Sequence, residues 1–256
     1  MEGKTSVSIP WWRENPLVVL FEWLALRLSL VYRGMGIPRG NGAPVVLIPG
    51  YLASDWSLRE MFHWLQRMGY RPYLSDIGWN NDCFDVLVDR LLETVEKVNA
   101  QTGRKVVLIG QSLGGVFARS VATRRPDLVA SVITLGSPFR GFRTNPFVQW
   151  LSDLTKTWVL WRRRPHVYHQ CCTLDCPCKT VAALHAPFPA SVPRRAVYSK
   201  TDGVVDWRYC LDDDPTTNFE IHCTHMGMGL NRAAYRFIAI ELAREAIPLD
   251  PQCQSE

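Results

Sequence analysis

The sequence lacks several features that would point to particular classes of protein. The apolar run from Leu17 to Tyr32 is shorter than the roughly 20 residues that a membrane-spanning helix needs, and it contains Glu22 and Arg27. Basic residues form no stripe beyond Arg162–Arg164 and the net charge is only +5, so we expect no nucleic-acid partner. Internal repeats and low-complexity tracts are also absent. We therefore expect a globular protein that does not span a membrane.

The sequence contains few cysteines and no clear targeting signal. Eight cysteines in 256 residues are too few for a small disulfide-stabilised scaffold. The first apolar run is not a convincing signal peptide, because it begins late, carries charges and is followed by no clear small-residue cleavage site. We therefore expect a cytoplasmic location, with free buried thiols. The alternative is a disulfide, which would require an oxidising compartment, among Cys171, Cys172, Cys176, Cys178, Cys210 and Cys223.

Residues 166–178 contain histidine and cysteine at a density that suggests a metal site. The pattern is His166-x-x-His169-x-Cys171-Cys172, followed by Cys176-x-Cys178. Structural zinc sites usually use pairs of ligands separated by a longer loop, and adjacent cysteines do not fit that spacing. We therefore predict no metal site here.

Apolar β-branched runs alternate with amphipathic stretches along most of the chain. With 47% apolar and 21% charged residues, the chain can bury one sizeable core, so we expect a single elaborated domain. Strands are predicted at Ala43–Ile48, Tyr70–Ser75, Val106–Ile109, Leu128–Leu135, Arg195–Ser199 and Phe219–Cys223. Helices are predicted at about 55–68, 84–99, 113–125 and 231–246. Asp55 or Ser57 is expected to cap the first of them, with Glu60, three residues after Ser57, completing a capping box. This alternation predicts an α/β fold, with a mostly parallel central sheet and helices on both faces.

The N-terminal segment, residues 1–42, lies outside this alternation. It contains the apolar run from Leu17 to Tyr32, for which two interpretations remain open. One is a helix packed on the domain. The other is an interfacial anchor with Trp11, Trp12 and Trp23 at the level of the lipid headgroups, which would give peripheral membrane association through residues 11–32.

A second irregular block, residues 139–193, interrupts the core formed by residues 43–138 and 194–256. It shows one clear helical stretch, Pro146–Trp161, and a block of this length inside a compact domain is usually functional. We interpret it as a cap, or lid, over a site. Its aromatic residues either line an apolar acyl pocket or form the cap's own core: Phe139, Phe142, Phe147, Trp150, Trp158 and Trp161.

The strongest functional signal is a sharp turn between the third strand and the helix after it. Val106–Ile109 is followed by the pattern G-x-S-x-G, formed by Gly110, Ser112 and Gly114. Such a serine adopts a strained backbone conformation so that its hydroxyl stands clear of the sheet, and side chains at the two glycines would collide with the turn. A buried strand before the motif and a helix after it are the context it requires. We therefore predict that Ser112 is a nucleophile.

A serine nucleophile needs a base within hydrogen-bonding reach and an acid that orients the base. In α/β sheets these partners lie on loops at the carboxyl ends of later strands. Asp202 directly follows one strand and His225 follows the next, which makes them the preferred acid and base. The competitors are Asp206, which lies a further turn away, and His222, which falls inside a predicted strand. The chain order of serine, acid and histidine is that of the α/β-hydrolases.

Acyl transfer also requires two backbone N–H donors for the developing oxyanion, each contributing about 3 to 4 kcal/mol. One donor is predicted to be the amide of Leu113, the residue after the nucleophile. The other is predicted in the loop after the first strand, at Tyr51, where the preceding Gly50 lets the backbone approach the substrate.

Five motifs in this order resemble the α/β-hydrolase superfamily, in particular its bacterial lipase and esterase branch. They are Ile48-Pro49-Gly50-Tyr51, the elbow from Gly110 to Gly115, Leu135-Gly136-Ser137-Pro138, Thr201-Asp202-Gly203-Val204-Val205 and Thr224-His225-Met226-Gly227. The resemblance covers roughly residues 43–246. One departure is Pro49, where many members carry a histidine that supports the oxyanion loop.

The resemblance implies a serine hydrolase that cleaves carboxylic esters through an acyl-enzyme, without a cofactor. The substrates it suggests are lipid-like acyl esters. An acyltransferase or a thioesterase would use the same Ser112, Asp202 and His225, so both remain alternatives. A non-catalytic binding module is the alternative from another class, and the intact set of three residues argues against it.

Overall fold

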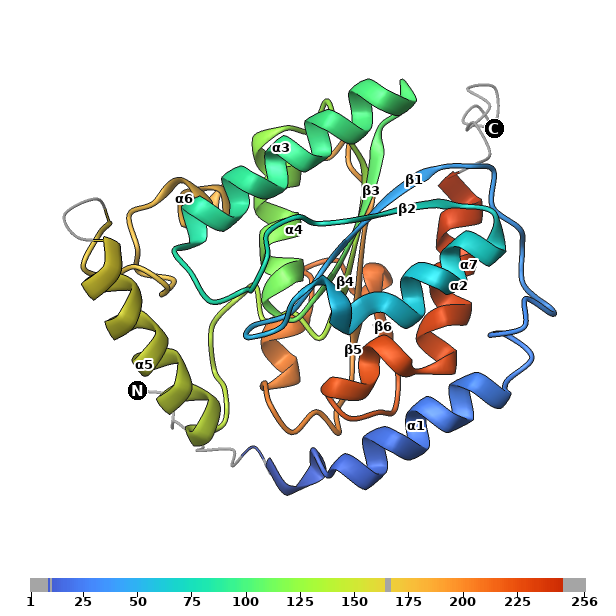
Figure 1. Cartoon of the computed structure of the whole chain (residues 1–256), viewed down its shortest axis with the longest axis horizontal. Coiled ribbons are helices and arrows are strands. Elements are labelled where there is room, and N and C mark those ends of the chain that lie inside the picture. The colour runs from blue at the N-terminus through green and yellow to red at the C-terminus, as the bar shows by residue number, and fades with distance from the viewer. Residues whose placement is uncertain (1–8, 10, 164–166, 246–256) are drawn as a thin grey trace.

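A six-stranded parallel sheet forms the centre of the protein (Figure 1). The computed structural model describes Ile9 and residues 11–163 and 167–245. The strands lie in the order β2-β1-β3-β4-β5-β6. Their bounds are β1 Pro44–Ile48, β2 Arg71–Leu74, β3 Val106–Gln111, β4 Val129–Leu135, β5 Arg194–Tyr198 and β6 Asn218–Glu220. The predicted α/β-hydrolase class is confirmed by this sheet and by the solved structures described below.

Alternation along the strands supplies a core on each face of the sheet. In β1, Val46 and Ile48 pack into one cluster, and Val45 and Leu47 pack into the other. All five residues of β1 are buried, as expected for a central parallel strand covered on both sides.

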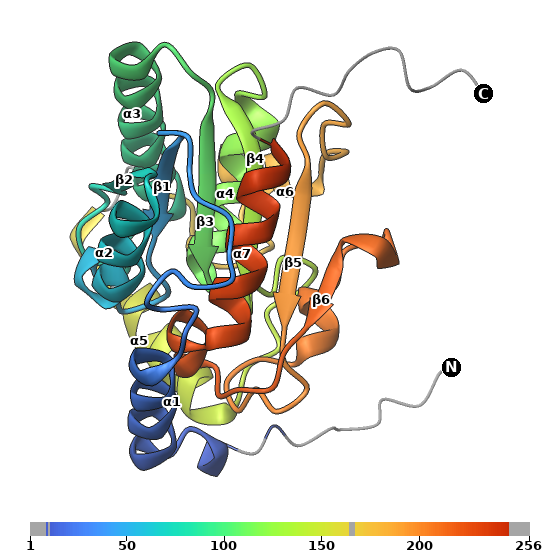
Figure 2. The same ribbon diagram turned by 90° about the vertical axis from the view of Figure 1, so that its right-hand side faces the viewer.

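Helices cover both faces, as the alternation predicts (Figure 2). The helices α3 (Phe84–Thr102), α4 (Leu113–Arg124) and α6 (Lys179–His185) pack in the first cluster. The helices α2 (Arg59–Met68) and α7 (Arg232–Glu245) pack in the second. The end of the last predicted helix, Ala246, lies outside the described residues.

The predicted capping box at the start of α2 is wrong. Residues Asp55–Leu58 form a separate 3-10 helix, η2, and α2 begins at Arg59 without a side-chain cap. Asp55 instead accepts hydrogen bonds from the backbone and hydroxyl of Ser75, because the end of β2 lies beside it. Glu60 accepts a hydrogen bond of 2.6 Å from Tyr32, so it serves tertiary packing.

The irregular block, residues 139–193, contains two helices that lie in different parts of the molecule. The predicted helical stretch is α5 (Pro146–Arg163), and it lies apart from the sheet over one end of the molecule (Figure 1). The second helix, α6, was not predicted, and it packs against α4 and α3. Arg163 forms an ion pair with Asp82 and thereby ties the end of α5 to the body of the protein.

The apolar N-terminal run forms the helix α1 (Pro16–Leu28), shorter than the run itself. One face packs on the domain, where Leu26 is fully buried and the Trp23 indole donates to Glu60. The opposite face exposes Leu17, Phe21, Leu24 and Leu28. In the described part of the chain, no helix combines the length and apolar character needed to cross a bilayer.

The seven described cysteines are buried free thiols. The Sγ atoms of Cys171 and Cys172 lie 3.7 Å apart, and this contact together with burial raises the pKa of Cys171 to about 12. Within the described ranges, no group of three or more histidine, cysteine or acidic residues could hold a metal ion. His169 is exposed, while His166 and Arg164 lie outside the described residues.

Candidate active site

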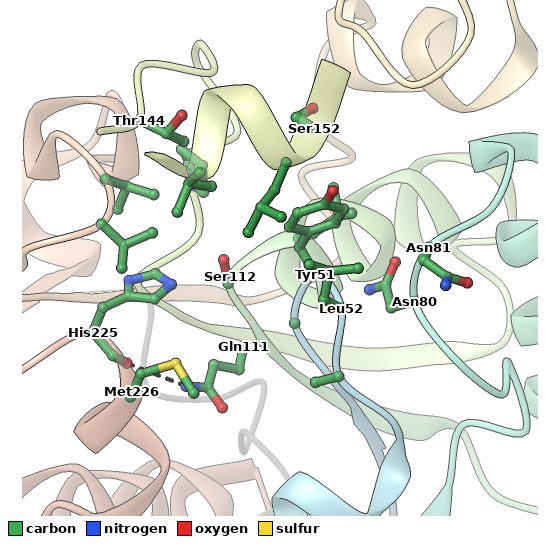
Figure 3. Close-up of a pocket in the computed structure, with 18 of the residues that line it drawn as sticks. Tyr51, Leu52, Asn80, Asn81, Gln111, Ser112, Thr144, Ser152, His225 and Met226 are labelled. Atoms are coloured by element: carbon green, nitrogen blue, oxygen red, sulfur yellow. Dashed lines mark hydrogen bonds between the residues drawn. The ribbon is translucent and has the colours of Figure 1, made fainter. Parts of the chain in front are cut away.

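A cavity of about 350 Å³ lies where Ser112 and His225 approach each other (Figure 3). Its wall is mainly apolar, as in most small-molecule sites. Contributions come from the loop after β1, the start of α4, the inner face of α5 and the loop after β6. The lining includes Gly50, Tyr51, Leu52, Asn80, Phe84, Gln111, Leu113, Phe142, Leu151, Cys172 and Met226.

Ser112 occupies the turn between β3 and α4 in a conformation that few residues adopt. Its φ is 52° and its ψ is −123°, which is strained for a residue with a side chain. A Cβ atom at Gly110 would clash with the backbone of Gly114, and one at Gly114 would clash with the carbonyl oxygens of Ile48 and Pro49. Both glycines are therefore required for the close approach of β3, α4 and the β1 loop.

Asp202 and His225 form a buried pair beside the cavity. The Asp202 Oδ2 atom lies 2.6 Å from His225 Nδ1, and each residue is only 4% exposed. The other carboxylate oxygen of Asp202 accepts from the amides of Val204 and Val205, both at 2.8 Å. These two bonds hold the carboxylate in the orientation that fixes the imidazole.

The competing residues lie elsewhere. Asp206 forms an ion pair with Arg208, which, against the opposing effect of burial, holds the pKa of that carboxyl below its usual range. His222 lies beyond the end of β6 and is exposed, so it is not the buried histidine that the predicted strand suggested.

The electrostatic surroundings of His225 favour its protonated form. Burial alone would lower the pKa of His225, but the charge and hydrogen bond of Asp202, with the charge of Glu14, raise that pKa above the ordinary 6.5. The carbonyl oxygen of His225 also accepts a hydrogen bond of 3.2 Å from Gln111, the residue before Ser112. Serine turn and histidine loop are thus directly tethered (Figure 3).

Leu113 and Tyr51, which carry the two predicted oxyanion donors, line the same cavity as Ser112. Leu113 is the first residue of α4, so its N–H has no acceptor within the helix. The loop carrying Tyr51 is so close that a Cβ atom at Gly50 would lie 3.9 Å from Ser112 Oγ. The Tyr51 hydroxyl contacts the Thr155 hydroxyl of α5 at 2.5 Å, which joins this loop to the covering helix.

Asn80 supports the loop after β1, and sequence reasoning did not identify it. Its side-chain amide donates to the carbonyl of Pro49 at 2.8 Å, and its backbone exchanges hydrogen bonds with Leu52 and Ala53. Pro49 has no side-chain donor of its own, so a residue about 30 positions later provides the anchor. An asparagine in a Trp-Asn-Asn-Asp turn carries no distinctive signal in one sequence.

The aromatic residues of the irregular block mostly do not line the cavity. Among those predicted, Phe142 does, whereas Phe147, Trp150, Trp158 and Trp161 are exposed on the outer face of α5. Phe139 is half-buried against the core, with the Arg119 guanidinium over its ring. The inner face of α5 instead presents residues at helical spacing: Val148, Leu151, Ser152 and Thr155.

Known proteins resemble this chain in sequence. A family model described as palmitoyl protein thioesterase matches residues 44–198. A triacylglycerol lipase of Pseudarthrobacter phenanthrenivorans is 37% identical over 123 residues, which cover 44% of this chain and 38% of the lipase. The mitochondrial palmitoyl-protein thioesterase ABHD10 of Rattus norvegicus is 24% identical over 212 residues, which cover 72% of this chain and 65% of that protein. The chain spans little more than a third of the curated lipases it matches, 38% and 34% for two of them.

Solved structures share the fold at low sequence identity. The mature lipase BlEst2 of Bacillus licheniformis superposes with a TM-score of 0.57 at 16% identity, covering 81% of this chain and 94% of that one. A monoacylglycerol lipase of Paleococcus ferrophilus gives a TM-score of 0.53 at 14% identity, covering 82% of this chain and 97% of that one. At these identities the likeness concerns the fold alone.

Proposed function

Because the chain belongs to the palmitoyl protein thioesterase family, we propose that it is a serine hydrolase that cleaves lipid-like acyl esters or thioesters. The observation that carries this proposal is the buried Asp202–His225 pair, 2.6 Å between Oδ2 and Nδ1, on the wall of an apolar cavity that also contains Ser112. Such a pair beside a strained serine is the arrangement that activates a hydroxyl nucleophile.

The proposed reaction proceeds in two stages. His225 Nε2 takes the proton of Ser112 as Oγ attacks the acyl carbon, and Asp202 stabilises the imidazolium that forms. The Leu113 and Tyr51 amides bind the oxyanion of the tetrahedral intermediate. The intermediate collapses to an acyl-enzyme as the imidazolium protonates the leaving alcohol or thiol. Water, deprotonated by His225, then releases the carboxylic acid and regenerates Ser112.

The substrate class follows from the cavity and the relatives together. Apolar residues such as Phe84, Phe142 and Leu151 would hold an acyl chain. Thioesters join esters in the proposal because the family model matches most of the core that carries Ser112. In both cases Ser112 attacks the same acyl carbon, so the leaving group is the only chemical difference.

We also propose that the two segments outside the core serve access to this cavity. The inner face of α5 would act as a cap over the acyl chain, within the predicted cap of residues 139–193. The exposed apolar face of α1 would lie on a membrane surface, with Trp11 and Trp12, 68% and 66% exposed, at headgroup level. Val19 of α1 lines the cavity, so a lipid surface against this helix would be close to the site.

The test is hydrolysis of matched oxygen esters and thioesters, with acyl chains from short to long, by the purified protein and by Ser112→Ala. We expect turnover that depends on Ser112 and increases with chain length until the cavity is filled. The acyl group should also be trapped on Ser112 in a rapid quench, detected by mass spectrometry. Turnover that persists in Ser112→Ala would reject the proposed nucleophile, and a folded wild type without turnover would favour an acyltransferase or a binding module.

A further inference from the structure

The N-terminal segment contacts the two loops that carry Asp202 and His225. Glu14 lies between the 3-10 helix η1 (Trp11–Arg13) and α1. Its Oε1 atom accepts a hydrogen bond of 2.7 Å from the amide of His225 and one of 2.9 Å from the amide of Gly203, the neighbour of Asp202. Its Oε2 atom accepts from the amide of Met226 at 3.1 Å. One carboxylate thus joins both loops from 189 and 211 residues away.

A second carboxylate of the same segment binds the histidine loop at Thr224, the residue before His225. Glu22 of α1 accepts hydrogen bonds from the amide and the hydroxyl of Thr224, at 2.8 and 2.6 Å. The Thr224 hydroxyl in turn accepts from the amide of Gly227 at 2.9 Å. Both acidic residues of the segment that the structure describes, Glu14 and Glu22, therefore contact the loops that carry Asp202 and His225.

We propose that Glu14 is a positioning residue of this hydrolase, which holds the acid loop and the histidine loop in register and stabilises the charged His225 during the reaction. This inference rests on the proposed function, because it assigns a role within that same triad. Three backbone N–H groups on one carboxylate form charge-assisted hydrogen bonds, which are roughly twice as strong as neutral ones. Glu14 is not one of the residues that line the cavity, but it binds the backbone amides of two that do, His225 and Met226, so it acts through His225.

The charged groups around His225 set the direction of the expected pH effect. Asp202 and Glu14 both face it and raise its pKa. Glu22 binds the neighbouring Thr224, and burial raises the pKa of the Cys223 thiol, which therefore stays neutral near pH 7. The base form of His225 is the neutral imidazole, so activity should be lost with falling pH through a pKa above 6.5.

The experiment compares wild type, Glu14→Gln and Glu22→Gln, each purified as the 256-residue chain, on a soluble short-chain ester across pH. Glu14→Gln keeps an oxygen acceptor but removes the charge, so the acid limb of kcat/KM should move to lower pH. Its plateau kcat should fall about tenfold, because the hydrogen bonds from the His225, Gly203 and Met226 amides lose their charged acceptor, with KM nearly unchanged. Glu22→Gln removes a comparable contact of the segment but should leave the acid limb in place.

A purely structural role predicts a different result. If Glu14 only attaches the segment, both variants should lower activity equally without moving the acid limb, and that result would overturn the inference. Unchanged rate and pH dependence in a folded Glu14→Gln would do the same. If Glu14→Gln does not fold, Glu14→Asp is measured instead. The retained charge should keep the acid limb of kcat/KM at the wild-type pH, while the shorter aspartate side chain should slow turnover. Turnover equal to that of wild type would contradict the inference. Loss of the proposed function itself would appear separately, as wild-type turnover no greater than that of Ser112→Ala.

Discussion

The serine side and the histidine side of the site are built in different ways. Ser112 is held by its own surroundings in the chain: the strand before it, the helix after it and two glycines within two positions. Its backbone amide donates to the carbonyl of Leu135 in the adjacent strand, at 2.8 Å. His225 and the Asp202 loop, by contrast, are held by Glu14 from 211 and 189 residues away.

This contrast separates what a short motif can encode from what only the folded chain provides. A strand-turn-helix can form its strained serine wherever the core accepts it, because the strand, the helix and the two glycines that shape the turn all lie next to Ser112 in the chain. The orientation of an imidazole depends on partners from several loops, and here one of those partners, Glu14, belongs to the N-terminal segment. Variation in the N-terminal segment could therefore change the histidine side without altering the motif.

Exchanging the Asp202 carboxylate for an amide should disrupt the histidine side most severely. Asp202→Asn replaces the acceptor of the His225 Nδ1 proton, and kcat should fall about 10⁴-fold, the loss seen for this exchange in serine proteases. Asp206→Asn is the matched control, since its partner Arg208 has a side chain that is 44% exposed, and we expect kcat to change less than about threefold. Single-turnover acylation rates measure both. Equal losses would show that the acid has been assigned to the wrong position.

A side chain at an elbow glycine should disrupt the serine side of the site. The expected effect is smaller than that of Asp202→Asn and appears as a lower free energy of unfolding. Gly114→Val would place atoms against the Ile48 and Pro49 carbonyls, and we expect the free energy of unfolding to fall by about 3 kcal/mol, the upper range for overpacking. Gly42→Ala is the control, because its φ is 76° but no atom lies within 4 Å of the added Cβ, and left-handed backbone alone costs about 1 to 2 kcal/mol. Urea unfolding distinguishes the two. A similar loss in both would mean that crowding at the elbow is not the restraint.

Much of the sheet could be predicted because buried strands have a simple periodic signal. The predicted ends of β4 and β5 are within one residue of those observed, whereas β6 ends at Glu220 instead of Cys223, since the chain turns away to place His225. The short helix α6 was missed because a stretch of seven residues shows too little periodicity. Asn80 and Glu14 were missed for another reason: their partners are close only after folding.

The smallest expected effect concerns the two faces of α1. The inner face packs on the domain, and the outer face is exposed and apolar. Leu17→Ser combined with Phe21→Ser removes side chains that are 72% and 71% exposed, so the core and the Glu14 contacts should remain intact. If the outer face docks on lipid, co-sedimentation with anionic vesicles should weaken about tenfold or more, given about 1.5 to 3 kcal/mol for each fully buried apolar side chain. Turnover of a soluble short-chain ester should change less than about twofold.

The control is Ile240→Ser on α7, where the residue is 36% exposed. It tests whether removing any exposed apolar side chain weakens vesicle binding. Vesicle binding that is unchanged in the double variant, or equally reduced by Ile240→Ser, would remove the membrane role and leave α1 as a holder of the catalytic loops alone.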